Sequence, residues 1–483
     1  SLDANTTGIR NVAIGLDALT GNTEGERNTA VGTYALKSVQ TADYLTAVGY
    51  GALYSNTSGA SNTGLGYASV FTNTTGSYNT GVGYNSLDHN TTGDSNTAVG
   101  YEALSANTTA NYNTAVGSRA GMATTTGTYN VAVGADALMS NTTGETNTAV
   151  GYDSLGDNTT GEQNVAVGQN CLSKNSTGHF NTAVGRSALH ANTTANSNTA
   201  VGYFALDSNT TGTQNVAVGA ESLETNTTGN YNTAVGRATL ENNTTGSNNT
   251  AIGINALEEN TTASFNTAVG VNALNVNTTG AENTAVGLQA LDANTTGSNN
   301  VAMGVNALTA NTTAYNNTSI GYATLIANVN GGSNTAIGYN AGYGASTNGN
   351  VSGDNNTFIG NNAVGTSDSV SNVITLGNGS ISTLRCQVTS ITSLSDERDK
   401  KNIFNLSAGL DFLNKLRPVS FTWNTRDKAK VDIDDNGFIA QELIAAQEET
   451  GITIPNLINA DNPDKLEAAY GTLVPVLVKA VQE

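Results

Sequence analysis

Hydrophobic and polar positions repeat along most of this chain with a period of 17 residues. One copy, which begins at Asn96, reads NTAVGYEALSANTTANY, and about twenty such copies run from Asn11 to Gly338 without a slip. Only four or five residues lie between turn signals, which is too few for a helical repeat. A fixed period of short strand phrases is typical of a stacked solenoid. We therefore predict a mainly β fold, a parallel β-solenoid or β-roll.

Two apolar positions of each copy are candidates for the core of the coil. Side chains along a strand alternate between two faces, and we expect Val99 to face inward together with Leu104. Ala98 would then face outward, where its small size indicates a neighbour at close range. The repeated glycine predicts a positive φ or a close backbone approach, and the repeated asparagine predicts hydrogen-bonded ladders between coils.

One coil buries too little apolar surface to offset the entropy of ordering 17 residues. We therefore expect help from neighbouring chains, and we predict a homotrimer of β-rolls or an interwound three-chain helix; the sequence leaves both open. The NTAVG phrase of each copy resembles the head repeats of trimeric autotransporter adhesins. Those heads are left-handed β-rolls with a shorter period, and the resemblance implies a similar roll here.

Composition narrows the choice of partners. The formal net charge is −20 and the repeats carry no cluster of Lys and Arg, which argues against nucleic acid as a partner. No run of 18 apolar residues occurs, so no membrane span is expected. Cys171 and Cys386 are too far apart in the pattern to indicate a disulfide, and the three histidines form no ligand set. We expect no metal and no cofactor.

Tyrosine recurs directly after the repeat glycine, which places aromatic side chains in columns along the coils. One interpretation is a platform on which the faces of sugars stack, and the other is stacking between coils that only stiffens the sheet. The candidate glycan contacts are Tyr50, Tyr67, Tyr84 and Tyr101.

The pattern changes after Gly338, because the next similar phrase, at Asn356, arrives five residues late. We expect three parts: a solenoid shaft at 1–342, a β-rich neck at 343–394, and a separate module at 395–483 with dense charge and helical periodicity. Helices are predicted within 406–416, 440–449 and 473–481. Ser1 and Glu483 interrupt a repeat and a helix, so we expect the chain to be a fragment of a longer protein.

Three ordered motifs carry a family resemblance. They are SDERDKKNI at 395–403, GFIAQE at 437–442, and YGTLVPVLVKA at 470–480. Residues 395–483 resemble the C-terminal intramolecular chaperone auto-processing domain of phage tail spikes and fibres, such as endosialidase spikes. The resemblance implies a small α+β domain that sets the register of a trimer and then cuts itself from the shaft.

In that family a serine and the lysine five positions later form a catalytic dyad, which corresponds here to Ser395 and Lys400, with Asp396 and Arg398 as supporting motif residues. A serine hydroxyl becomes a nucleophile when a base accepts its proton, and a lysine removed from water can act as that base. Ser395 would attack the carbonyl of Leu394 to give an ester, which water then resolves. The family's cut thus falls between Leu394 and Ser395.

These observations favour a trimeric virion tail-fibre protein for host-surface attachment. Its expected partners are a cell-surface glycan or protein receptor and other virion tail proteins, bound through a region preceding Ser1. The alternatives are a bacterial trimeric surface adhesin with the same chaperone, located at the cell surface, and a glycan-degrading tail spike. Beyond a single self-cleavage before Ser395, no enzymatic activity is expected.

Overall fold

The computed structural model describes residues 2–343, 352–365, 367–381, 383–385, 395–426, 430–460, 464 and 466–483. The chain divides into two units, residues 1–300 and 301–483, and each unit is described by itself.

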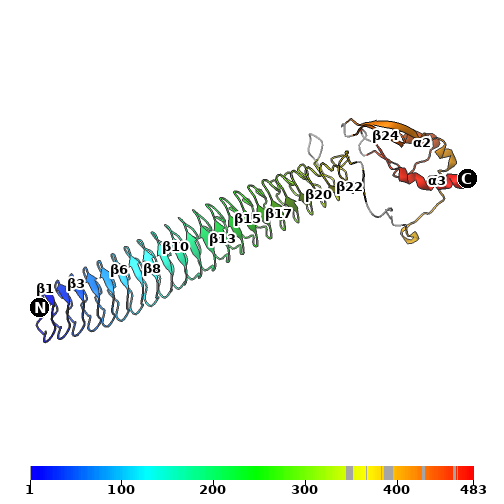
Figure 1. Cartoon of the computed structure of the whole chain (residues 1–483). Coiled ribbons are helices and arrows are strands. Elements are labelled where there is room, and N and C mark those ends of the chain that lie inside the picture. Colours follow the sequence, from blue (N-terminus) through cyan, green and yellow to red (C-terminus); the bar gives the residue numbers. More distant parts are fainter. Residues whose placement is uncertain are drawn as a thin grey trace. The chain divides into compact units, whose positions relative to one another are not determined.

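The first unit is a stack of coils (Figure 1). Its described residues form seventeen strands of three residues each, and each of the first sixteen pairs in parallel with the strand 17 residues later; Thr97, for example, pairs with Thr114. The parallel solenoid predicted from the sequence is therefore confirmed. The strands are β1 (Val12–Ile14), β2 (Thr29–Val31), β3 (Thr46–Val48), β4 (Thr63–Leu65), β5 (Thr80–Val82), β6 (Thr97–Val99), β7 (Thr114–Val116), β8 (Val131–Val133), β9 (Thr148–Val150), β10 (Val165–Val167), β11 (Thr182–Val184), β12 (Thr199–Val201), β13 (Val216–Val218), β14 (Thr233–Val235), β15 (Thr250–Ile252), β16 (Thr267–Val269) and β17 (Thr284–Val286).

The side chains of these strands face the opposite way from the one expected. Ala98, the middle residue of β6, is fully buried, whereas Thr97 and Val99 on either side lie partly exposed on the outer face. The prediction that the valine column faces inward is therefore wrong, as is the inference that the alanines meet a neighbouring chain. The inside of the coil is narrow, and only a small residue fits opposite the fully buried leucine column. A Cβ added to Gly64, which takes the alanine position in β4, would lie 3.3 Å from Leu53 Cγ.

Two backbone features make the coil tight. The leucines of the core, such as Leu104 with φ of 50°, have a backbone in the left-handed region. This conformation is strained for a residue with a side chain, and the burial of the leucine side chains offsets its cost. The repeated glycine adopts φ near 140°, and a Cβ at Gly100 would lie 2.3 Å from the carbonyl oxygen of Gly117 in the next coil. The sequence expectation of positive φ and close backbone approach at this glycine is confirmed.

Two asparagine columns carry the polar interior. In the first, Asn96 Nδ2 donates to Ala110 O at 2.8 Å, and Asn96 Oδ1 accepts from the backbone N–H of Asn113 at 3.0 Å. In the second, Asn107 Nδ2 donates to Asn90 Oδ1 at 2.6 Å. Each coil is thus tied to the next by buried hydrogen bonds, as expected for asparagine ladders.

The second unit begins with the same coil and ends in a different module. Its strands β18 (Val301–Met303), β19 (Thr318–Ile320), β20 (Thr335–Ile337), β21 (Thr357–Ile359) and β22 (Ile374–Leu376) also pair in parallel. The step from Thr335 to its partner Thr357 is 22 residues, so the five extra residues leave the pairing register unchanged. Coils of the same kind in the two units amount to about 21 turns.

The C-terminal module contains short helices and two small antiparallel sheets. Among its described residues, buried Phe412, Leu443, Leu457, Leu473 and Val476 belong to one hydrophobic core. The helices expected within 440–449 and 473–481 are present, while the one expected within 406–416 is reduced to a single turn. The elements are η1 (Glu397–Asp399), α1 (Leu410–Leu413), β23 (Val419–Asn424), β24 (Val431–Gly437), α2 (Ala440–Thr450), β25 (Ile458–Asn459), β26 (Glu467–Ala468), η2 (Tyr470–Leu473) and α3 (Val474–Gln482).

None of the helices in the described parts of the chain has the length and apolar character needed to cross a membrane.

Candidate functional site

The first of the three motifs of the module folds into a single helical turn, η1. Asp396 caps this turn: its Oδ1 accepts a hydrogen bond from the backbone N–H of Arg398 at 2.9 Å, and the N–H of Lys400 closes the turn on Glu397 O at 3.1 Å. An aspartate in this position satisfies a backbone donor that the turn leaves free. The turn brings Ser395 and Lys400, which flank it, to the same side.

Arg398 holds the capping carboxylate in place. Its guanidinium donates from Nε to Asp396 Oδ1 at 3.0 Å and from Nη2 to Asp396 Oδ2 at 2.5 Å. These bonds lower the pKa of Asp396 below its ordinary value, because Arg398 stabilises the ionised form. The two motif residues thus have a physical role, which is to fix the turn that positions the dyad.

Lys400 Nζ lies 2.7 Å from Ser395 Oγ and 3.3 Å from Ser395 O. The distance between nucleophile and candidate base is that of a direct hydrogen bond. Both residues are exposed in the single chain, whereas a lysine acts as a base for a serine hydroxyl when it is removed from water. The dyad can work as nucleophile and base only when something covers it. Leu394, the other side of the expected cut, lies outside the described residues.

The second and third motifs meet each other. The hydroxyl of Tyr470 accepts from the backbone N–H of Phe438 at 3.1 Å and lies 3.1 Å from Phe438 O. A Cβ at Gly437 would lie 2.7 Å from that hydroxyl, so a larger residue there would displace Tyr470. These contacts join β24 to η2. They explain why the second motif carries a glycine at 437 and the third a tyrosine at 470.

The module that carries this dyad was compared with known protein families. Residues 395–452 match the family model described as chaperone of endosialidase. The match includes Ser395, Lys400 and Gly437, and it ends before Tyr470. A chaperone segment of the endosialidase type that follows a solenoid of 17-residue coils fits the tail-fibre resemblance inferred from the sequence. The comparison with curated proteins found no match.

The tyrosines expected to contact glycans form one row in the first unit. The rings of Tyr50 and Tyr67 lie 5.2 Å apart, those of Tyr67 and Tyr84 5.1 Å, and those of Tyr84 and Tyr101 5.5 Å, with planes within 12° of parallel. All four are about half exposed. The structure therefore brings these four residues together, far along the sequence from the endosialidase-chaperone segment.

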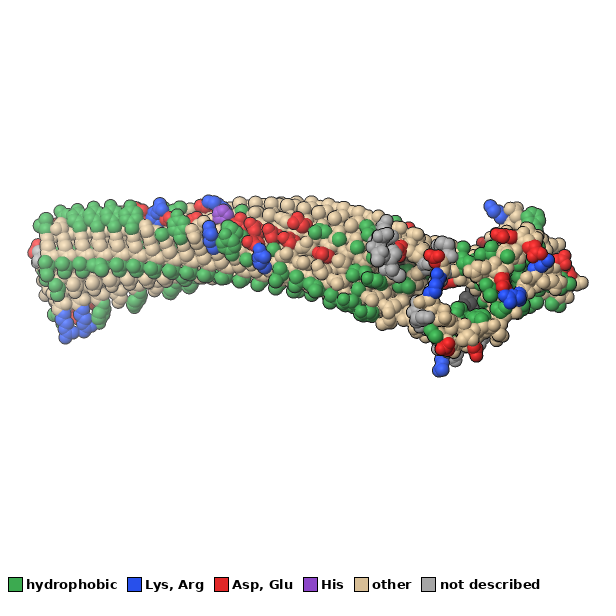
Figure 2. All heavy atoms as spheres, turned by 90° about the horizontal axis from the view of Figure 1, so that it is seen from above, with side chains coloured by type: hydrophobic (Ala, Val, Ile, Leu, Met, Phe, Trp, Pro, Cys, Tyr) green, Lys and Arg blue, Asp and Glu red, His purple; other side chains and the backbone are tan. Residues whose placement is uncertain are grey.

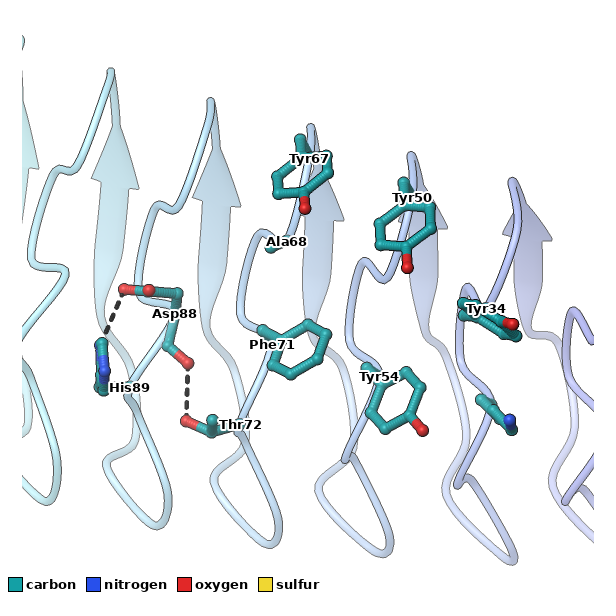
Figure 3. Close-up of a pocket in the computed structure, with 10 residues that line it drawn as sticks. Tyr34, Tyr50, Tyr54, Tyr67, Ala68, Phe71, Thr72, Asp88 and His89 are labelled. Atoms are coloured by element: carbon teal, nitrogen blue, oxygen red, sulfur yellow. Dashed lines mark hydrogen bonds and ion pairs between the residues drawn. The ribbon is translucent and has the colours of Figure 1, made fainter.

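A second aromatic row was missed in the sequence. Tyr54 and Phe71 stack at 4.9 Å beside the first row, and Tyr34 crosses the end of both rows at a steep angle (Figure 3). The available signal was the 17-residue spacing of Tyr54 and Phe71, which a search for tyrosine alone does not find.

No group of three His, Cys, Asp or Glu side chains suited to a metal ion occurs in the part of the chain that the structure describes.

Proposed function

We propose that the chain is a trimeric tail-fibre protein for attachment to a host surface, and that its C-terminal chaperone aligns three chains and then cuts the chain between Leu394 and Ser395. The observation that carries this proposal is the 2.7 Å contact of Lys400 Nζ with Ser395 Oγ inside a segment of the endosialidase-chaperone family.

The proposed cleavage needs no group beyond the dyad and water. Lys400, once neutral, accepts the proton of Ser395 Oγ while this oxygen forms a bond to the carbonyl carbon of Leu394. The bond from that carbon to the Ser395 nitrogen breaks, and the nitrogen leaves with the proton held by Lys400. The product is an ester of Leu394 on Ser395 Oγ. Water hydrolyses it, which frees the carboxylate of Leu394 and the Ser395 hydroxyl.

A surface of helix α3 supports the proposed trimer. Leu473 and Val476 face the core of the module, whereas Val474, Leu477, Val478 and Val481 are more than half exposed. The spacing of these four exposed residues, i, i+3, i+4 and i+7, is that of a coiled-coil seam. Such a seam is satisfied when equivalent helices of other chains pack against it.

The apolar residues after the dyad point to the same need for partners. Ile403 and Phe404 expose 63% and 85% of their surface in the single chain. Partner chains that cover these side chains would also exclude water from Lys400, which is the condition for its action as a base. Assembly would then switch on the cut, so that cleavage follows correct register.

The outer face of the solenoid offers a third support. The last residue of each strand from β1 to β22 is Val, Ile, Leu or Met, and many are more than a third exposed, such as Ile252 at 41%. Figure 2 shows hydrophobic side chains in rows that run from one coil to the next along the stack. Monomers seldom expose apolar surface on this scale. A partner that matches the same spacing over so many coils is another copy of the chain.

Expression of four forms of the chain tests the proposal: wild type, Ser395→Ala, Lys400→Ala and the matched control Lys401→Ala. We expect a cut in the wild type and the control, with a new N-terminus at Ser395 by intact mass spectrometry, and no cut in the other two. Uncut Ser395→Ala should sediment with the mass of three chains. Cleavage that persists at the same bond in Ser395→Ala would exclude the dyad, and a monomer would exclude the trimer.

A further inference from the structure

A groove of about 650 Å³ lies between the two aromatic rows of the first unit (Figure 3). One wall is the pair Tyr50 and Tyr67, with rings 5.2 Å apart and planes 8° from parallel, and the other is the pair Tyr54 and Phe71, at 4.9 Å and 12°. In Figure 3 these four rings are seen with their faces open, whereas Tyr34 at one end is seen edge-on. The four rings of the walls come from two successive coils, and the lining of the groove as a whole, from Tyr34 to His89, comes from four.

Two small residues leave room for this groove, and one of them, Ala68, lines it. Gly51 and Ala68 occupy the coil position at which the neighbouring coils carry Asn85, Glu102 and Arg119. A Cβ at Gly51 would lie 3.0 Å from Phe71 Cε2, so the glycine gives the ring its place. Longer side chains at these two positions would fill the space between the walls.

Polar groups stand at the two ends of the groove. Lys37 Nζ lies 4.6 Å from the centre of the Tyr34 ring and 3.3 Å from Asp17 Oδ2. At the other end, His89 Nδ1 lies 3.1 Å from Asp88 Oδ1 and 3.0 Å from Ser105 O. Because both neighbours of Nδ1 are acceptors, this nitrogen carries a proton. The groove thus offers charged hydrogen-bonding groups at its ends and aromatic faces between them.

We propose that this groove binds an extended, uncharged oligosaccharide of about four pyranose units. The C–H faces of pyranose rings pack on aromatic faces, and the coil spacing of about 4.8 Å is close to the length of one pyranose in an extended chain. Hydroxyl groups at both ends would reach Lys37 and Asp88. This inference rests on the proposed attachment function, for which it names the receptor class.

The charges disfavour other polymers with flat or extended groups. Nucleic acid would bring phosphates, but Lys37 is already paired with Asp17 and the chain has a net charge of −20. Proline-rich peptides also dock in aromatic grooves. Their repeat of three residues is about 9 Å long and spans two coils, whereas one pyranose spans one coil. A decaproline peptide is therefore included in the test as the competing ligand.

Titration calorimetry of the full chain with cellotetraose, chitotetraose, maltotetraose and decaproline tests the groove. We expect an extended β-linked tetrasaccharide to bind and the curved maltotetraose to bind at least tenfold more weakly. Tyr54→Ala with Phe71→Ala should weaken binding by about tenfold or more. Ala68→Arg should abolish it by filling the floor, while the coil accepts this residue because Arg119 occupies the same position with φ of 57°.

The matched control is Tyr112→Ala with Tyr129→Ala, since this pair also stacks, at 5.0 Å, but lies at another position of the coil. Binding should be unchanged in it, and melting temperatures check that all variants fold. The inference would be overturned by any of three results. These are no binding of either β-linked sugar at millimolar concentration, full binding of the sugar by Ala68→Arg, and binding of decaproline alone. Electrophoresis of the same samples reports cleavage and assembly separately, so a cut trimer that binds no sugar contradicts the groove and leaves the fibre proposal standing.

Discussion

At the scale of single residues, two exceptions to the repeat compensate for each other. Val70 occupies the coil position that leucine holds in most copies, and it adopts φ of 54°, which is strained for a β-branched residue. Gly81 stands in β5 where most strands have alanine, and a Cβ there would lie 2.6 Å from Val70 Cγ2. The branched methyl group of Val70 therefore occupies the space of the missing alanine side chain.

This pairing predicts a strong dependence of one substitution on the other. Gly81→Ala alone should destabilise the solenoid by about 1–3 kcal/mol, because the new methyl group overpacks against Val70. The same change combined with Val70→Leu restores the residues of the other coils, and the double variant should be at least as stable as wild type. Guanidinium unfolding of wild type, both single variants and the double variant measures the coupling. Additive effects would contradict the proposed compensation.

At the scale of the element, the buried asparagine ladder holds neighbouring coils together. Asn158 Nδ2 donates to Asn141 Oδ1 at 2.9 Å and to Gly161 O at 3.0 Å, and Asn158 Oδ1 accepts from Asn175 Nδ2 at 2.8 Å. An aspartate keeps only the accepting role. It would place a buried carboxylate against two acceptor oxygens.

We expect Asn158→Asp to cost about 2–5 kcal/mol of local stability. Cys171 in the next coil can report this loss: it is buried, burial raises the pKa of its thiol to about 12, and it reacts with thiol reagents only when the coil opens. In a Cys386→Ser background, labelling of Cys171 at neutral pH should be at least about thirtyfold faster in Asn158→Asp. The control Thr160→Asp adds the same charge at an exposed position of the same coil and should label like wild type. Equal rates in all three would show that the ladder does not limit opening.

The sequence predicted the elements better than the facing of their side chains. The 17-residue period identifies the solenoid because each copy must stack on the next, and the motifs around Ser395 identify the chaperone segment. The facing of the strand could not be predicted, because alternate positions hold Ala98 and Val99 and both are apolar. The second aromatic row was not predicted, because it combines Tyr54 with Phe71 at the 17-residue spacing and a pattern of tyrosine alone does not show it.

At the scale of the whole molecule, carboxyl groups behave differently in the solenoid and in the C-terminal module. In the solenoid, burial raises the pKa of several carboxyl groups above their ordinary values, and Figure 2 shows acidic side chains gathered on one face. Three of them, Asp207, Glu224 and Glu241, follow one another at the same position of successive coils. The carboxyl groups with raised pKa are those of Asp88, Asp153, Asp207, Glu224, Glu241 and Asp292.

In the module, hydrogen bonds to the ionised forms lower the pKa of carboxyl groups. Arg398 does so for Asp396, as described above, and the backbone N–H of Leu410 does so for Glu483, which accepts from it at 2.6 Å. Trp423 lowers the pKa of Asp435 in the same way, with its Nε1 donating at 3.1 Å. These groups are exposed, so each contribution to stability is small.

The two sets predict opposite responses to acid. A folded pKa above the unfolded value means that the folded solenoid binds protons that the unfolded chain releases, so its stability rises as pH falls from 7 toward the unfolded values near 4. Weaker repulsion within a chain of net charge −20 acts in the same direction. The lowered pKa values of the module stabilise it fully above about pH 4, and this stabilisation is lost as pH falls through the folded values.

Thermal melting between pH 7 and pH 3 should therefore move two transitions apart. Labelling of Cys171 reports on the solenoid, which should melt at higher temperature at pH 5 than at pH 7. Fluorescence of Trp423, the one tryptophan of the chain, reports on the module, which should melt at lower temperature below pH 4. Asp207→Asn with Glu224→Gln and Glu241→Gln should raise the solenoid transition at pH 7 and flatten its pH dependence, because the partly buried charges are gone. A solenoid transition that falls between pH 7 and pH 5 in the wild type would mean that burial of these carboxylates does not govern its stability.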